Sequence, residues 1–238
     1  MLWHEIFGIE QNLEALFSPT HLMLATGAFF FVSGPLRAAW QRKGGRGWGE
    51  LLPAVLSVTM LFSMFTFFTQ YANIFGNPAV LNTNIGGTRY FIEVTSVSYI
   101  LIPAALMMGS ILLVMRRWQL PFGSLTLMFV VNALVMLLMR FEFASPYWRT
   151  VVAAGIGGLF ADILVLWLQP SAVRHNILRL FAFLVPFVYF LLVLGAIALT
   201  GPRGLWWEIH TWLGVPFVAG TIGVGLSFLV VSPPQPVE

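Results

Sequence analysis

The sequence predicts an all-α fold, a polytopic membrane bundle of seven transmembrane helices preceded by an amphipathic helix at the membrane interface. Of the 238 residues, 58% are hydrophobic and only 9% are charged, whereas a soluble domain carries about 25% charged residues. The apolar residues form long runs, each close to the roughly 20 residues that a helix needs to cross a bilayer. The chain also lacks the period-two alternation that is typical of a membrane β-barrel.

The N-terminal segment, residues 1–17, has the pattern of an interfacial helix. Apolar residues recur along it at helical spacing, and Glu10 and Glu14 fall on the opposite face. A helix with this pattern lies flat on the membrane surface. Ser18 and Pro19 end the segment, and we expect Ser18 or Thr20 to cap the first membrane span.

Seven apolar segments follow, and we expect each of them to span the membrane as a helix, which satisfies its own backbone hydrogen bonds in lipid. The segments cover residues 21–40, 51–72, 94–115, 122–139, 148–168, 178–199 and 210–230. Residues 1–231 therefore form a single transmembrane domain. The proline-rich residues 232–238 are expected to be a disordered tail.

Small residues at helical spacing predict where helices pack closely. The fifth span carries Ala154 and Gly158 four positions apart, and the last span carries Gly220, Gly223 and Gly225. In membranes, such faces allow two helix backbones to approach each other. We therefore expect the fifth and seventh spans to make tight helix contacts.

The basic residues predict the orientation of the chain. Eight of the twelve Lys and Arg residues fall on one side of the predicted spans, and six of the nine acids fall on the other. The eight are Arg37, Arg42, Lys43, Arg46, Arg116, Arg117, Arg174 and Arg179. Because basic loops stay in the cytoplasm, the chain is expected to be a multi-pass protein of the cell (inner) membrane, with its N-terminus outside and its C-terminus cytoplasmic.

Imidazoles and carboxylates gather at the predicted outer face. The candidate metal ligands are His21, His210, His4, Glu93 and Glu208. Imidazole and carboxylate bind copper or zinc where thiolates are missing, and the chain has no cysteine. The alternative is that these residues cap helix ends where headgroups and water begin. Met60 and Met64 in the second span are a weaker indication of Cu(I), because methionine also fills gaps in apolar interiors.

Asp162 is the only acid deep within a predicted span. Ionisable groups at membrane depth are costly, which makes them candidates for function. Asp162 is expected either to form an ion pair, with Arg37 as a candidate partner beside Arg116 and Arg179, or to act as a proton relay.

No motif in the sequence specifies a reaction, so a binding role is favoured over an enzyme. The single lysine, Lys43, lies in a loop, which excludes a retinal Schiff base. The preferred hypothesis is an accessory protein that holds a metal or cofactor at its outer face, or a subunit of a larger membrane complex or homo-oligomer. The alternatives are a proton-coupled transporter that uses Asp162 and a membrane metalloenzyme with an outer site. Lipid is the expected surrounding, and no nucleic-acid partner is expected.

Overall fold

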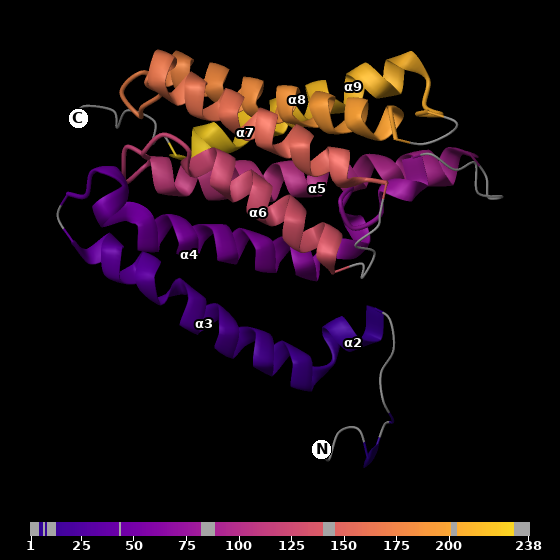
Figure 1. Ribbon diagram of the computed structural model, residues 1–238, viewed down its shortest axis with the longest axis horizontal. Helices are drawn as coiled ribbons and strands as arrows, with labels where there is room; N and C mark the ends of the chain where they lie inside the picture. The colour runs from indigo at the N-terminus through magenta and orange to yellow at the C-terminus, as the bar shows by residue number, and fades with distance from the viewer. Residues whose placement is uncertain are drawn as a thin grey trace, which may run out of the picture.

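The computed structural model describes residues 5–6, 8, 13–42, 44–81, 89–139, 146–200 and 204–230. These residues form an all-helical fold without β-strands (Figure 1). The helices are α2 (Leu13–Phe17), α3 (Pro19–Gln41), α4 (Gly47–Phe68), α5 (Arg89–Met115), α6 (Ser124–Leu138), α7 (Trp148–Leu168), α8 (His175–Ala198) and α9 (Ile209–Val230). His4, much of the predicted interfacial helix and the tail 232–238 lie outside the described residues.

Six described helices are long and apolar enough to cross a bilayer: α3, α4, α5, α7, α8 and α9. The chain is therefore a multi-pass membrane protein. The fourth predicted span, residues 122–139, departs from the prediction because α6 has only 15 residues. At 1.5 Å per residue it is about 22 Å long, which is less than the roughly 30 Å of hydrocarbon in a bilayer. The predicted count of seven spans is thus reduced to six long helices and one short one.

Six helices form a closed ring, and α3 lies outside it. Around the ring each helix contacts the next, in the order α4, α6, α7, α8, α9 and α5, and α5 closes the ring against α4. Helix α3 packs mainly against α4, at the edge of the bundle opposite to α8 and α9 (Figure 1). Only Ser33 and Leu36 of α3 are buried, so most of this helix faces lipid or a groove.

Two small-residue contacts bring helix backbones together, as the sequence predicts. A Cβ added to Gly158 of α7 would lie 2.5 Å from Cα of Thr126 in α6. A Cβ added to Gly223 of α9 would lie 1.9 Å from the carbonyl oxygen of Ala182 in α8. Gly225 differs from the prediction, because no atom lies within 4 Å of the position its Cβ would take.

Residues 70–81, which follow α4, cover one end of the ring. They contain two 3-10 helices, η1 (Gln70–Ala72) and η2 (Pro78–Leu81). Ile74 and Leu81 are completely buried, and the backbone N–H of Ile74 donates to the Tyr99 carbonyl of α5 at 3.1 Å. The ring of Phe75 lies 6.2 Å from that of Tyr189 in α8. This segment therefore belongs to the core of the bundle.

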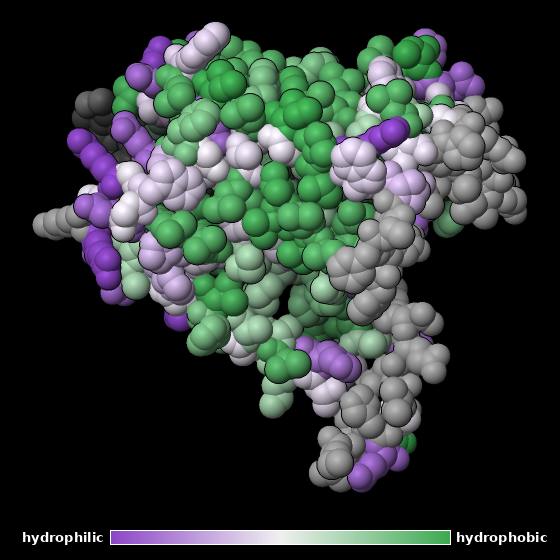
Figure 2. Space-filling view, viewed as in Figure 1, coloured by the Kyte–Doolittle hydropathy of each residue, from purple (hydrophilic) through white to green (hydrophobic). Residues whose placement is uncertain are grey.

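Hydrophilic residues gather at the left end of the molecule in Figure 2, and a hydrophobic belt covers its middle. At this end α3, α5, α7 and α9 finish, and α4, α6 and α8 begin (Figure 1). We call it the basic end, because most of the predicted cytoplasmic arginines lie there. Two of them bind the carbonyls that a helix leaves without partners at its C-terminus. Arg117 donates to the carbonyls of Trp40 and Arg42 at 3.2 and 2.8 Å, and Arg174 donates to that of Leu168 at 3.0 Å.

Helix α3 is attached to the bundle at the basic end and diverges from α4 toward the other end (Figure 1). Besides the Arg117 contact, Trp40 and Trp118 meet edge to face with their centroids 5.1 Å apart. Further along, Ser57 Oγ of α4 donates to the Val32 carbonyl of α3 at 2.5 Å. Beyond this point the two helices separate and leave a groove.

Candidate functional site

The four candidate metal ligands that the structure describes are not gathered into one site. His21 lies in the first turn of α3 and His210 in the first turn of α9, and these two helices occupy opposite edges of the bundle (Figure 1). Among the residues that the structure describes, no three His, Asp or Glu side chains are close enough to hold a metal ion. His4 lies outside the described residues. A copper or zinc site at this face therefore gains no support.

Glu93 connects two helices. The hydroxyl of Thr211 in α9 donates to Oε1 of Glu93 in α5 at 2.5 Å. The Glu93 carboxylate therefore accepts from the hydroxyl of Thr211, the residue that follows the candidate ligand His210. Glu208 precedes α9, and its backbone carbonyl accepts from the N–H of Trp212 at 2.9 Å. The Glu93 carboxylate therefore links α5 to α9, and the Glu208 backbone supports the first turn of α9.

Asp162 of α7 caps the N-terminus of α6. Its two carboxylate oxygens accept hydrogen bonds from the backbone N–H groups of Leu125 and Thr126 at 3.1 and 2.9 Å, and from Thr126 Oγ1 at 2.6 Å. The residue before α6 is Gly123, with a left-handed φ of 91° and no side chain to serve as a cap. A carboxylate from the neighbouring helix takes over that role, which the positive end of the helix dipole favours.

Arg37 finds its partners within its own helix. Its guanidinium donates to the Phe30 carbonyl at 3.1 Å and lies 6.0 Å from the centre of the Phe30 ring. The structure thus gives Arg37 and Asp162 separate partners. Asp162 is 98% buried and bonded to three donors, an arrangement that explains its place at membrane depth without proton transfer.

The groove between α3 and α4 encloses about 680 Å³. Its walls come from α2, α3, α4 and η1, with Val135 of α6 and Met139 directly after that helix. Most of the lining is apolar: Ala15, Leu16, Leu24, Ala25, Ala28, Val32, Met60, Met64, Phe67, Phe68, Val135 and Met139. Figure 2 shows a hollow on this face of the molecule with hydrophobic residues around it.

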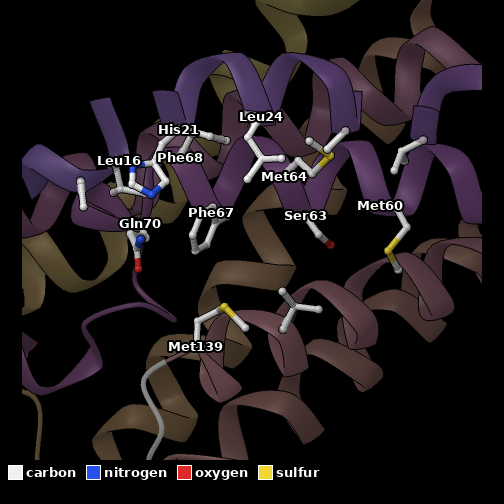
Figure 3. Close-up of a pocket in the computed structure, with 15 residues that line it drawn as sticks. Leu16, His21, Leu24, Met60, Ser63, Met64, Phe67, Phe68, Gln70 and Met139 are labelled. Carbon is white, nitrogen blue, oxygen red and sulfur yellow. The ribbon is translucent and has the colours of Figure 1, made fainter. Parts of the chain in front are cut away.

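Polar side chains lie at one end of this groove. In Figure 3, His21 and Gln70 occupy the end next to Leu16, while Met60 lies at the other end. Ser18, which caps α3 as one of the two predicted alternatives, also orients the histidine, because its hydroxyl lies 2.7 Å from His21 Nδ1. The groove is therefore polar at one end and, apart from Ser63, apolar along the rest of its length.

A buried polar contact supports the wall of the groove between α4 and α6. Nδ2 of Asn132 in α6 donates to Thr66 Oγ1 at 2.6 Å and lies 3.5 Å from Ser63 Oγ. Ser63 also lines the groove. Interhelical hydrogen bonds of this kind hold membrane helices in register, so the α4 side of the groove is fixed by the ring.

Sequence reasoning identified part of this groove and missed the rest. His21, Met60 and Met64 were singled out by residue type, but their common location was not. The small residues Ala25 and Ala28 of α3 were overlooked, although two alanines within one turn leave space beside a helix. No protein-family model, curated protein or solved structure matches the chain. The geometry of the chain itself is therefore the basis for a function.

Proposed function

We propose that this chain is a membrane binding protein that takes an amphiphilic lipid-like molecule from the bilayer into the groove between α3 and α4. The apolar chain of the ligand would lie along Met60, Met64 and Phe67, and its polar group would meet His21 and Gln70. The observation that carries the proposal is the gradient of polarity along one groove (Figure 3).

The size and position of the groove support this ligand class. Small-molecule sites typically enclose about 300–1,000 Å³ and are mostly apolar with a few polar groups, and this groove of about 680 Å³ falls in that range. Because α3 packs mainly against α4, the groove opens sideways, where lipid would surround the bundle. A hydrophobic molecule would then enter without crossing water.

A groove-filling substitution tests the proposal. Ala28 lines the groove, and we expect Ala28→Trp to lower the amount of co-purified lipid or quinone-like amphiphile roughly tenfold, because the indole takes the space of the ligand. The measurement is mass spectrometry of organic extracts from protein purified in mild detergent. Ala38→Trp, on an exposed position of α3 away from the groove, is the matched control. Equal ligand content in both variants would contradict the proposal.

We also propose that α6 is a seventh, short crossing and that the basic end faces the cytoplasm. The positive-inside rule supports this orientation, with Arg42, Arg46, Arg116, Arg117 and Arg174 at one end of the bundle. In a crossing of this kind α6 would begin inside the apolar layer, where Asp162 substitutes for the water that normally satisfies a helix N-terminus.

The absence of cysteine makes the orientation simple to measure. Ala172 and Pro146 are exposed positions that flank α7 at its two ends. In intact cells, a membrane-impermeant maleimide should label Pro146→Cys and leave Ala172→Cys unlabelled until the cells are opened. The reverse pattern would show that the basic end faces outward.

A further inference from the structure

A second cavity lies between α3 and α4 at the basic end, on the far side of the helix contact from the groove. It encloses about 260 Å³ and is lined by Arg42, Gly44, Gly45, Glu50, Leu51 and Trp118, with Ala39. That volume has room for roughly nine water-sized groups. It brings an arginine, a glutamate and a tryptophan together around one small space.

Trp118 brings a buried donor to this cavity. Its side chain is only 6% exposed, and its Nε1 has no hydrogen-bond partner in the part of the chain that the structure describes. A Cβ added to Gly45 would lie 3.4 and 3.5 Å from Cδ1 and Nε1 of the indole, so the N–H edge of the ring faces the glycine side of the cavity. A buried donor without a partner costs about 1–3 kcal/mol, which points to an acceptor supplied by a ligand.

The backbone on the glycine side favours a negatively charged group. Gly44, Gly45 and Gly47 have φ values of 85°, 128° and 71°, a left-handed conformation that residues with a side chain rarely adopt. The turn leads directly into α4, whose first N–H groups carry partial positive charge. With the Arg42 guanidinium and the indole N–H of Trp118, the cavity offers three kinds of donor to a phosphate.

Glu50 disfavours a simple anion as the ligand of this cavity. One of its carboxylate oxygens accepts from the Arg46 backbone N–H at 3.0 Å, and the residue also lines the cavity. A carboxylate beside a phosphate is repulsive unless a positive group separates them. A ligand that carries both a phosphate and an ammonium group offers an acceptor to Arg42 and Trp118 and a positive charge to Glu50.

We propose that this cavity binds a phosphoethanolamine group, with the phosphate toward Arg42 and Trp118 and the ammonium toward Glu50. Its position at one end of the membrane-spanning bundle favours phosphatidylethanolamine as the source. The site uses none of the residues that line the α3–α4 groove at the other end, so either proposal can fail without the other.

Native mass spectrometry of the full chain, purified with phosphatidylethanolamine and phosphatidylglycerol present together, tests the site. Trp118→Phe keeps the ring but removes the N–H, and we expect retained phosphatidylethanolamine to fall roughly tenfold. Glu50→Gln keeps an acceptor for the Arg46 N–H, and it should abolish the preference for phosphatidylethanolamine over phosphatidylglycerol. Trp167→Phe, an exposed tryptophan of α7, is the matched control and should retain lipid as the wild type does.

A second measurement distinguishes a membrane lipid from a soluble molecule as the source of the phosphoethanolamine group. Retained phosphatidylethanolamine identifies the membrane as the source, whereas binding of soluble phosphoethanolamine to delipidated protein without lipid retention identifies a free ligand. Inorganic phosphate that competes as well as phosphoethanolamine would overturn the role of Glu50. Wild-type lipid content and preference in both Trp118→Phe and Glu50→Gln would overturn the site.

Discussion

Replacing Asp162 with alanine is expected to destabilise the protein by about 2–4 kcal/mol, because it leaves buried donors at the start of α6 without acceptors. Two backbone N–H groups and the Thr126 hydroxyl lose their partner together. Asp162→Asn should lower the free energy of unfolding by about half as much. Its amide oxygen can still accept a hydrogen bond, but its N–H₂ group faces a donor and cannot bond to it. The measurement is thermal unfolding of the purified protein in one detergent.

Leu159→Ala on the same helix is the control for the Asp162 variants. The side chain of Leu159 is exposed on the surface of the bundle, so its truncation should change the stability of the protein little. An Asp162→Ala protein as stable as the wild type would contradict the capping role and restore the proton relay as the explanation for a buried acid.

Gly223→Ala is expected to cost about 2–3 kcal/mol or more, because the added methyl group meets a backbone that cannot move independently of its helix. The new Cβ would lie 1.9 Å from the carbonyl oxygen of Ala182, and relief requires α8 and α9 to separate. The same thermal unfolding measurement applies.

Gly225→Ala provides a matched control two positions along the same helix. No atom lies within 4 Å of its added Cβ, and alanine is the better helix former by about 1 kcal/mol. This variant should therefore be neutral or slightly more stable. Equal losses for both glycines would show that the close α8–α9 contact at Gly223 does not account for the effect, because helix propensity favours alanine at both positions.

The sequence by itself determined the membrane class and the long helices. Hydrocarbon accepts only helices or closed barrels, so a long uncharged apolar run has few conformations to choose from. The sequence also predicted the Gly158 and Gly223 contacts, because small residues at helical spacing allow two membrane helices to approach each other closely. The predominance of arginine at one end also follows directly from the order of the spans.

Lateral position and helix length were decided by the tertiary structure. The order of spans assigns His21 and His210 to one end of the bundle, but only packing places α3 and α9 at opposite edges (Figure 1). The apolar run 122–139 does not reveal where α6 begins, because its first N–H groups are satisfied by Asp162, 36 and 37 positions away in the chain. The groove likewise exists because α3 packs on one helix instead of joining the ring. Contacts between residues distant in sequence fix each of these features, and no local pattern encodes them.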